Sequence, residues 1–197
     1  IKDVARANMF LRTASRVYIQ LANFKATTFD ELFDRVKDIP WEDILTKDLG
    51  VVVIAKALKS TLMAFSSIQS VTQKAIVVRL MDKRGQYRLP DKNTVTVEVS
   101  IYEDEVFVYL DTSGDALHKR GDRTLVGEAP LRETLAAGMI LLSFWKHDRV
   151  LFDPFVGSGT IPIEAALIGR KIAPGKNRNF MYEKLSKGSL VKQAVLE

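Results

Sequence analysis

The chain has 197 residues, of which 47% are hydrophobic and 27% are charged, proportions that are typical of a globular protein with one or two domains. It has no cysteine, only two histidines and no apolar run of about eighteen residues, which excludes disulfides, a thiolate zinc site and a membrane span, and we predict no bound metal. The net charge of +5 favours a polyanionic partner, and the lack of a visible signal peptide favours a cytoplasmic location.

The first predicted elements are a strand and a capped helix. Residues 1–24 alternate between polar and apolar side chains, so we expect a strand over 17–21, after a turn or another strand near residues 7 to 11. Thr28 stands three residues before Glu31, which is the spacing of a capping box, and this pair predicts that a helix begins there. Pro40 is expected to end that helix.

Three more strands and a long helix complete the first predicted region. Residues 50–55 are apolar on both faces, which favours a central strand. Apolar residues at helical spacing predict a helix over 67–80. Strict alternation predicts a half-buried strand over 95–101, and residues 106–110 are expected to return from it as the second strand of a hairpin.

A basic stretch with several glycines follows, and we predict that residues 113–129 form a linker. Pro130 occupies a favoured first-turn position and predicts a helix to about Trp145. This helix is apolar on nearly all sides, so we expect it to be buried. A short apolar strand is then predicted over 150–152, and an apolar helix over 161–168.

The most informative motif joins these last two elements. A strand, a tight glycine turn and a helix in succession are typical of the way an α/β sheet presents a nucleotide-like ligand. The glycines allow a sharp bend and a close approach of the backbone to a ligand, and Asp153 can accept hydrogen bonds from a ligand amine or hydroxyl. Pro162 stands where a dinucleotide fingerprint needs glycine, and no lysine follows as in a Walker loop. The alternative is a plain β–turn–α connection whose glycines serve packing. The motif reads Asp153-Pro154-Phe155-Val156-Gly157-Ser158-Gly159-Thr160.

This motif resembles the first motif of S-adenosylmethionine-dependent methyltransferases with a Rossmann-like fold, in particular those that act on amino groups of nucleic-acid bases. Many relatives carry cysteine where this chain has Val156. The resemblance implies S-adenosylmethionine as the cofactor, with Asp153 accepting from its methionine end and Phe155 forming a wall of the pocket. Glu164 either braces the turn or lies on the surface. The implied cofactor-binding residues are Asp153, Pro154, Phe155, Gly157, Ser158, Gly159 and Thr160.

The first region resembles the THUMP domain of RNA-modifying enzymes, preceded by a small ferredoxin-like piece. The resemblance rests on residues 54–60, 67–80 and 95–110 and implies that the region binds RNA, ribosomal RNA in the first place and tRNA as a second possibility. Basic side chains there either neutralise RNA phosphates or form an ordinary solvated face. The candidates are Lys56, Lys59, Lys74, Arg79, Lys83 and Arg84, with Lys119 and Arg120 in the linker.

Two further segments add to the resemblance. Residues 118–123 are similar to the family's His-x-Arg-Gly-Tyr-Arg, with Asp122 in place of the tyrosine. The start of the helix after Pro130 is similar to the family's helix beside the cofactor, so its polar residues either face the cofactor or cap the helix and form surface ion pairs. These residues are Arg132, Glu133 and Thr134.

Together these features predict an α/β protein: a ferredoxin-like piece plus an α+β THUMP domain over 1–112, a linker over 113–129, and the start of a Rossmann-like methyltransferase domain over 130–197. Residues 172–175 and 177–180 further resemble the bacterial ribosomal RNA guanine-N2 methyltransferases, and this resemblance implies methylation of ribosomal RNA at N2 of guanine. The alternatives are methylation of DNA at N6 of adenine or a non-catalytic RNA-binding module. The family's catalytic Asn/Asp-Pro-Pro-Tyr/Phe motif does not occur in the sequence. The catalytic residues are therefore unknown, and we expect this chain to be a fragment that does not methylate alone.

Overall fold

A computed structural model describes residues 2–121 and 131–186. The chain divides into two compact units. The flanking unit comprises Ile1–Val17 and Asp115–Phe180, and the inserted unit comprises Tyr18–Gly114 together with Met181–Glu197. The chain therefore passes between the two units three times. The domain boundaries predicted from the sequence stay a prediction.

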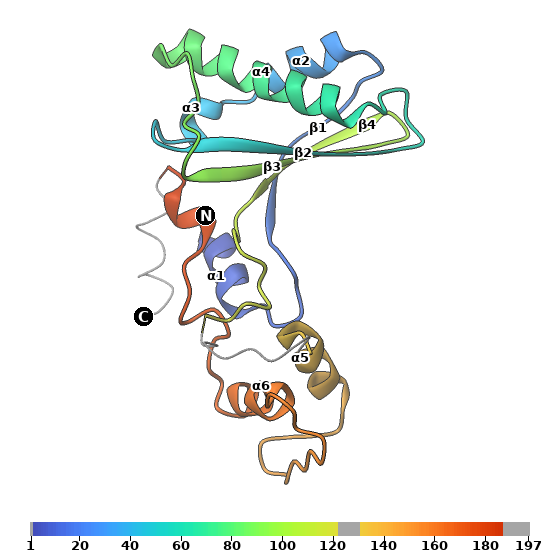
Figure 1. The fold of residues 1–197 in the computed structure, drawn as a ribbon, viewed down its shortest axis with the longest axis vertical. Helices are drawn as coiled ribbons and strands as arrows, with labels where there is room; N and C mark the ends of the chain where they lie inside the picture. Colours follow the sequence, from blue (N-terminus) through green and yellow to red (C-terminus); the bar gives the residue numbers. More distant parts are fainter. Residues whose placement is uncertain (1, 122–130, 187–197) are drawn as a thin grey trace. The chain divides into compact units, whose positions relative to one another are not determined.

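The inserted unit is built on one four-stranded sheet (Figure 1). The strand order is β1-β4-β3-β2, in which β4 pairs antiparallel with both β1 and β3, while β2 pairs parallel with β3. Glu103 and Asp104 join β3 to β4, and both have positive φ angles, 50° and 62°, as a type I′ hairpin turn requires. The strands are β1 (Tyr18–Lys25), β2 (Gly50–Leu58), β3 (Thr94–Tyr102) and β4 (Glu105–Asp111).

The prediction that residues 50–55 form a central strand is wrong in its position. They lie within β2, which is the last strand in the sheet order. Its second apolar face is solvent-exposed, since Val52 is 46% and Ile54 41% exposed. An exposed apolar side chain and a buried one look alike in a sequence, and this is why the pattern suggested burial on both sides.

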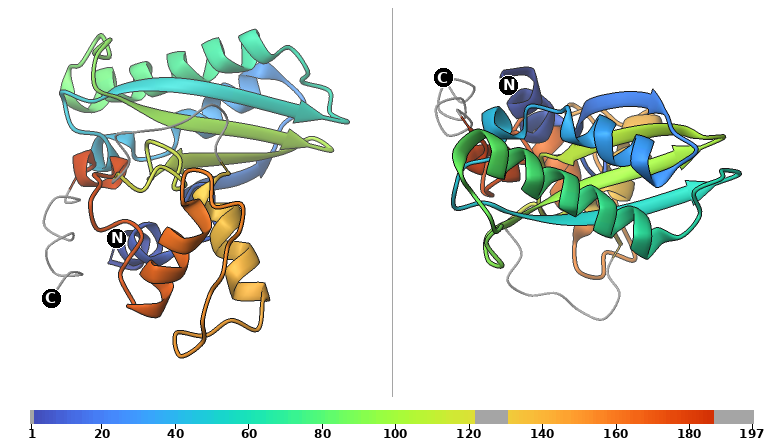
Figure 2. Two further views of the ribbon diagram at one scale, coloured as in Figure 1. Left: turned by 60° about the horizontal axis from the view of Figure 1, so that its bottom comes forward. Right: turned by 90° about the horizontal axis from the view of Figure 1, so that it is seen from above.

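Two helices cover one face of this sheet, α2 (Phe29–Lys37) and α4 (Phe65–Arg84) (Figure 1; Figure 2). The capping box that opens α2 is confirmed. The Thr28 side chain accepts from the Glu31 backbone N–H at 3.2 Å, and the Glu31 carboxylate accepts from the Thr28 N–H at 3.2 Å. The helix ends before Pro40, as predicted, and the short helices α3 (Trp41–Ile44) and η1 (Met181–Lys184) complete the unit.

The core of the inserted unit lies between these helices and the sheet. Alternate residues of β3 point toward it, which confirms the predicted half-buried strand. Each large apolar side chain that leaves water contributes about 1.5–3 kcal/mol. Trp41 is fully buried, and its indole N–H donates to the Val36 carbonyl at 2.8 Å, so its polar atom is satisfied. Fully buried members of this core include Leu32, Val36, Ile68, Ile76, Leu80, Val95, Val97, Val99 and Val108.

The flanking unit contains the helices α1 (Lys2–Phe10), α5 (Glu133–Leu142) and α6 (Thr160–Gly169). The expected turn or strand near residue 7 is wrong, because this segment is part of α1. Its buried residues Ala5, Asn8 and Met9 are three and four positions apart, which is helical spacing. The apparent alternation of polar and apolar residues had suggested a strand instead. None of the described helices is long and apolar enough to cross a membrane.

Two expectations about the flanking unit need correction. Residues 150–152 are not a strand: all strands of the described residues lie in the inserted unit, and an extended segment forms a strand only when another strand pairs with its backbone. The helix predicted after Pro130 exists as α5, yet it is not buried on all sides, since Leu142 is 89% exposed. Pro130 and Asp122 lie outside the described residues.

Candidate functional site

The glycine motif forms a turn that leads directly into α6. One carboxylate oxygen of Asp153 accepts from the Phe155 backbone N–H at 3.1 Å. The Gly159 N–H donates to the Val156 carbonyl at 2.7 Å, which closes the turn, and the Gly159 carbonyl accepts from Ile163 N–H at 3.0 Å as α6 begins. The motif thus forms the turn and helix that the sequence predicted.

Both glycines of the turn have backbone conformations that favour glycine. The φ angle is +50° at Gly157 and +77° at Gly159, in the left-handed region that other residues rarely adopt. A Cβ atom on Gly157 would have only the Phe155 carbonyl oxygen nearby, at 3.8 Å. Tight packing therefore does not explain this glycine, and the space beside it is open.

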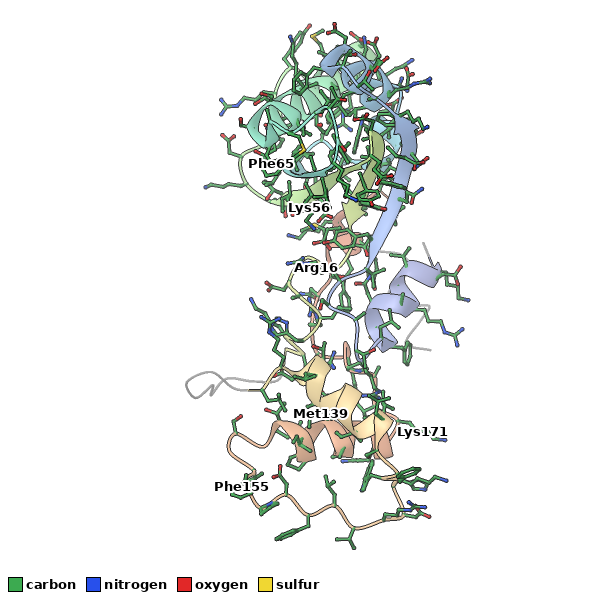
Figure 3. The ribbon with its side chains drawn as sticks, turned by 90° about the vertical axis from the view of Figure 1, so that its right-hand side faces the viewer. Arg16, Lys56, Phe65, Met139, Phe155 and Lys171 are labelled. Atoms are coloured by element: carbon green, nitrogen blue, oxygen red, sulfur yellow. The ribbon has the colours of Figure 1, made fainter. Side chains whose placement is uncertain are left out.

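Most of the turn is accessible. Phe155 is 92% exposed, and its side chain extends away from the ribbon (Figure 3). The turn thus combines an acidic acceptor, Asp153, with glycine backbone that a ligand can approach closely. These residues fit a cofactor that carries an amine and hydroxyl groups, as S-adenosylmethionine does.

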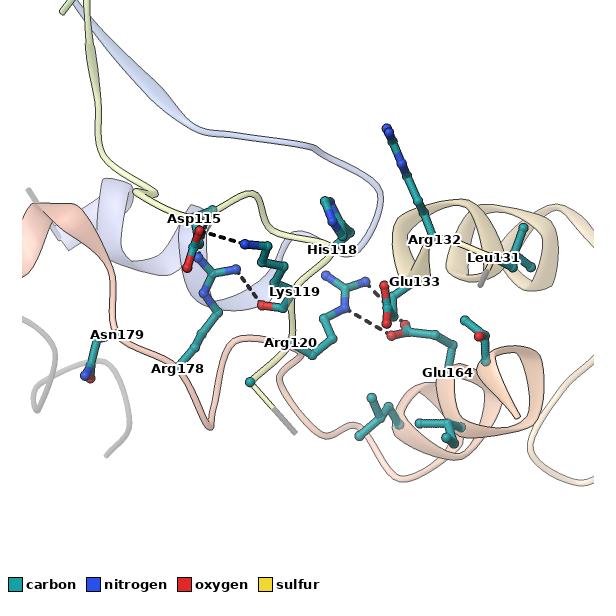
Figure 4. A pocket seen from close by; sticks show the side chains of 14 residues that line it. Asp115, His118, Lys119, Arg120, Leu131, Arg132, Glu133, Glu164, Arg178 and Asn179 are labelled. Atoms are coloured by element: carbon teal, nitrogen blue, oxygen red, sulfur yellow. Dashed lines mark hydrogen bonds and ion pairs between the residues drawn. The ribbon is translucent and has the colours of Figure 1, made fainter. Parts of the chain in front are cut away.

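Glu164, one turn into α6, is fully buried and braces the helix. Its carboxylate receives two hydrogen bonds from the Arg120 guanidinium, from Nε at 3.0 Å and from Nη2 at 3.4 Å (Figure 4). Of the two possibilities that the sequence left open for Glu164, exposure on the surface is wrong, and its carboxylate binds Arg120. That it braces the glycine turn stays a prediction.

The same geometry shows where Arg120, a predicted RNA contact, places its charge. Only 6% of this residue is exposed. Besides binding Glu164, its guanidinium donates to the Leu117 carbonyl at 2.9 Å and to the Arg12 carbonyl at 2.7 Å. Arg120 therefore has a structural partner for its charge and little surface to offer to a phosphate.

A pocket of about 730 Å³ lies beside this ion pair, within the flanking unit (Figure 4). Arg132 and Glu133 line it, and Arg132 occupies the N-cap position of α5 without a side-chain capping bond. Burial lowers the pKa of His118, with Glu133 acting in the opposite direction and Arg132 in the same direction. The other residues that line the pocket are Asp115, Lys119, Arg120, Gly121, Leu131, Thr160, Ile163, Glu164, Leu167, Arg178 and Asn179.

The candidate lysines of the inserted unit lie on opposite sides of its sheet. Lys56 alternates along β2 with Ala55 and Ala57, which pack against the core, so its side chain projects from the face that the helices leave uncovered (Figure 3). Its ammonium contacts Glu98 at 2.8 Å, and this hydrogen bond raises the pKa of Lys56. Lys74, in contrast, is exposed on α4 over the covered face. The structure does not gather all predicted RNA contacts on one surface.

Two arginines among these candidates have structural partners that the sequence did not reveal. Arg79 forms a two-pronged ion pair with Glu42, at 2.9 and 2.7 Å, which holds α3 against α4 and lowers the pKa of Glu42. Arg84 donates to the Leu45 carbonyl at 2.6 Å, and burial lowers its pKa. Lys59, Lys83 and Lys119 are exposed, although Lys119 also contacts Asp115 at 3.0 Å.

Sequence reasoning missed Arg12 and the structural contacts of Arg178. Arg178 donates to the carbonyls of Asp115, Ala116 and Lys119 at 2.6–2.8 Å, and its guanidinium lies over the Phe180 ring at 5.0 Å. These partners are backbone carbonyls far away in the chain. No spacing pattern in the sequence could have indicated them.

Two family models match the chain. Residues 26–111 match the THUMP domain, and residues 120–196 match the RMKL-like, methyltransferase domain, UPF0020. The two matches agree with the order of the two resemblances along the sequence. The predicted α/β fold class is confirmed as well.

Curated relatives cover nearly the whole chain. Putative RNA methyltransferase YpsC of Bacillus subtilis (strain 168) is 47% identical over 183 residues, which are 91% of this chain and 48% of that protein. Ribosomal RNA large subunit methyltransferase K/L of Psychromonas ingrahamii is 37% identical, over 91% of this chain and 24% of that protein. The tRNA (guanine(6)-N2)-methyltransferase of Methanocaldococcus jannaschii is 35% identical, over 92% of this chain and 49% of that protein. The chain thus spans about half or less of the length of these relatives.

Solved structures show the same fold. A predicted N6-adenine-specific DNA methylase from Listeria monocytogenes is 48% identical with a TM-score of 0.89, over 99% of this chain and 53% of that one. SMU.472, described as a putative methyltransferase complexed with SAH, is 40% identical with a TM-score of 0.86, over 98% of this chain and 53% of that one. Residues 26–111 are thus similar to THUMP domains and residues 120–196 to RMKL-like methyltransferase domains, and the chain resembles proteins that carry both.

Proposed function

We propose that the protein that carries this chain transfers a methyl group from S-adenosylmethionine to the exocyclic amine of an RNA base, at N2 of guanine. The observation that carries the proposal is the presence, in one chain, of a THUMP domain and of the exposed glycine turn before α6. The name of the Methanocaldococcus relative, a tRNA guanine-N2 methyltransferase, supports the position on the base. Because the chain spans only about half of that relative, the activity is proposed for the whole protein.

The cofactor is proposed to occupy the glycine turn. When bound, S-adenosylmethionine supplies an activated methyl group. Asp153 would accept hydrogen bonds from the cofactor's amino end, and Gly157 and Gly159 would allow its close approach to the backbone. Phe155 would form an apolar wall. Pro154, Ser158 and Thr160 complete the proposed set.

The inserted unit is proposed to deliver the RNA in the cytoplasm, with ribosomal RNA as the first candidate and tRNA as the second. Exposed lysines neutralise phosphates, and the resulting release of counterions makes the affinity depend on salt. The relatives of the K/L type, whose names refer to the large ribosomal subunit, favour ribosomal RNA. The exposed lysines proposed for this role are Lys56, Lys59, Lys74 and Lys83 of the inserted unit, together with Lys119 of the flanking unit.

The activity is tested with labelled S-adenosylmethionine and two substrates at matched salt, structured large-subunit ribosomal RNA and duplex DNA. We expect the RNA alone to be labelled and to yield N2-methylguanosine after digestion to nucleosides. Labelled N6-methyladenine in the DNA would overturn the proposal in favour of the activity named for the Listeria neighbour. The absence of any transfer by the whole protein would favour a non-catalytic RNA-binding module.

The cofactor site is tested by titrating S-adenosylhomocysteine into the whole protein. Asp153→Asn keeps the shape of the side chain but removes its charge, and a hydrogen bond to a charged group contributes about 1.5–3 kcal/mol. We therefore expect roughly tenfold weaker binding, since about 1.4 kcal/mol corresponds to a factor of ten. Asp148→Asn, an exposed acid shortly before the turn, is the matched control and leaves the affinity unchanged. Equal affinities for both variants would contradict the assignment of Asp153.

The two faces of the inserted unit are tested by their salt dependence. Replacing a lysine that neutralises an RNA phosphate by alanine is expected to reduce the magnitude of the slope of log K for RNA binding against log salt by about 1. Lys56→Ala with Lys59→Ala probes the uncovered face of the sheet, and Lys74→Ala with Lys83→Ala probes α4. The pair that lowers the slope identifies the face that meets RNA, and unchanged slopes for both pairs would exclude all four lysines.

A further inference from the structure

The three passages of the chain between the two units share one feature. Each has an arginine beside it on the side of the flanking unit: Arg12 before the first passage, Arg120 after the second and Arg178 before the third. In the described hydrogen bonds of these three guanidinium groups, every acceptor belongs to the flanking unit. This arrangement suggests a role that differs from RNA contact.

These hydrogen bonds connect the three passages to one another. The Arg178 guanidinium donates to the Asp115 and Ala116 carbonyls, which belong to the second passage, at 2.6 and 2.8 Å. The first two passages are joined to each other as well, by the Leu117 N–H that donates to Ser15 at 2.8 Å and by Arg120, which donates to the Arg12 carbonyl. The first two passages therefore cannot shift independently of each other without breaking these hydrogen bonds.

The same arginines hold the helix that starts at the glycine turn. Arg120 binds the buried Glu164 in the middle of α6. Arg12 donates through Nη2 to the Leu167 carbonyl at 3.3 Å and to the Ile172 carbonyl at 2.6 Å, at the end of α6 and just beyond it. The helix is thus attached at two points to the connections into the inserted unit, and Gly159 at its start moves with it.

Stability alone does not require a charged pair at this position. Well-packed apolar residues of similar volume are often as stable as a buried ion pair, or more stable. An ion pair with two-pronged geometry, however, fixes direction and distance, which apolar contacts do not. The Arg120–Glu164 pair therefore fixes the position of α6, and an apolar replacement would not.

We propose that Arg12, Arg120 and Glu164 are positioning residues that couple the connections into the inserted unit to the glycine turn. Binding of RNA by the inserted unit would act on the segments 12–17 and 115–120, and through them on α6 and the turn. RNA and cofactor then influence each other's binding, reciprocally and by the same factor. This coupling rests on the proposed function, whereas the attachment of α6 does not.

The attachment is tested by hydrogen exchange, which needs no ligand. The double variant Arg120→Met with Glu164→Leu replaces the pair by apolar residues of similar size. We expect a melting temperature near that of the wild type together with faster exchange of the α6 amides, Ile163 and its neighbours. The control, Lys37→Met with Asp82→Leu, removes an ion pair of 3.0 Å in the inserted unit and leaves α6 exchange unchanged. Wild-type exchange in the Arg120/Glu164 variant would overturn the proposal.

The coupling is tested in the whole protein with S-adenosylhomocysteine and a structured transcript of large-subunit ribosomal RNA. We expect saturating RNA to change the affinity for S-adenosylhomocysteine at least about fivefold in the wild type, the lower range of typical coupling, and not in the double variant. If the double variant does not fold, Arg120→Lys keeps the charge but loses the forked donors and gives a reduced coupling. Equal coupling in wild type and variant would overturn the proposal. A wild type that binds no S-adenosylhomocysteine would refute the proposed function. The hydrogen-exchange experiment would then still test whether the Arg120–Glu164 pair holds α6.

Discussion

In the inserted unit most large apolar side chains lie between the sheet and its helices, with Val52 and Ile54 among the exceptions, whereas in the flanking unit several are almost fully exposed. Val150 is 96% exposed and Phe144 90%, and Phe152 and Phe155 are similarly accessible. Among the described residues, the flanking unit instead buries a charged pair, Arg120 and Glu164. The inserted unit is thus built around one apolar core, whereas the described part of the flanking unit combines buried apolar residues such as Met9, Ile140 and Phe180 with hydrogen bonds of buried arginine.

This difference has a physical meaning. A unit whose apolar residues are already covered can be stable as it stands, while exposed apolar patches are typical of surfaces that bind something else. The described part of the flanking unit offers such a surface beside the glycine turn. We expect the apolar side chains around residues 142–156 to pack against further structure in a protein of the relatives' full length.

The largest expected effect tests the charged pair. Glu164→Ala leaves the Arg120 guanidinium buried without its partner, which typically costs about 3–5 kcal/mol. The two tryptophans report the two units separately, since Trp41 belongs to the inserted unit and Trp145 to the flanking unit. Unfolding in urea is followed by tryptophan fluorescence in two backgrounds, each with the other tryptophan replaced by phenylalanine. We expect Glu164→Ala to shift the transition reported by Trp145 to lower urea and to leave the transition reported by Trp41 unchanged. Equal shifts would show that the units unfold together.

The complementary change tests the apolar core. Ile76→Ala removes a fully buried side chain of α4 and is expected to lower the unfolding free energy by about 2–5 kcal/mol. The Trp41 transition reports this loss. Lys74→Ala, at an exposed position of the same helix, serves as the control and changes stability by less than about 0.5 kcal/mol. A small effect of Ile76→Ala would show that the core is less tightly packed than the structure indicates.

A smaller effect is expected at the start of α2. Thr28→Ala removes the hydroxyl that caps the Glu31 N–H and should cost about 1 kcal/mol in the same Trp41 measurement. Thr28→Ser keeps the hydroxyl and should retain most of the stability. An equal loss in both variants would assign the effect to the threonine methyl group and not to the cap.

The exposed apolar surface is tested by the binding of a hydrophobic dye. Phe144→Ser with Phe152→Ser should lower dye binding by the 197-residue chain while its stability stays within about 0.5 kcal/mol, because neither ring is packed. Tyr87→Ser, at a single exposed ring of the inserted unit, should leave dye binding unchanged. A large loss of stability in the double variant would show that these rings are buried in solution.

The smallest effect concerns stability at alkaline pH, and stability at neutral pH is not affected. Burial raises the pKa of Tyr182 from 10.0 to about 12. The folded protein then holds this proton more tightly than the unfolded chain, so the contribution to stability is present below pH 10 and is lost as the pH rises through about 12. Tyrosinate absorbance should show one late titration that Tyr182→Phe removes. A late titration that persists in this variant would belong to another tyrosine.

The sequence predicted those features that depend on near neighbours in the chain. The capping box of Thr28 and Glu31, the alternation of β3 and the glycine turn each combine residues a few positions apart, and their side-chain chemistry determines the local backbone. The structure has all three where the sequence predicted them.

Features that depend on distant partners could not be predicted. Whether a strand is central or at the edge depends on its neighbours in the sheet, so the apolar pattern of β2 was misleading. Arg120 lies in a basic linker and looked like a phosphate ligand, but its partner Glu164 is 44 positions away. Arg12 and Arg178 bind backbone carbonyls, which every residue has, so residue types could not reveal these partners.

The pairing of β1 with β4 has a consequence for how the protein can be divided. Tyr18 and Asp111 are register partners, so the segment between them enters and leaves the sheet at the same place. A segment with adjacent ends resembles a domain inserted into a loop, and such domains tolerate excision and transplantation. Cutting after residue 112 would separate α1 from the rest of its own unit. A pair of cuts near residues 18 and 114, closed by a short glycine-rich loop, would instead release the four-stranded sheet with α2 and α4, while residues 181–197 of the inserted unit would stay on the continuous remainder.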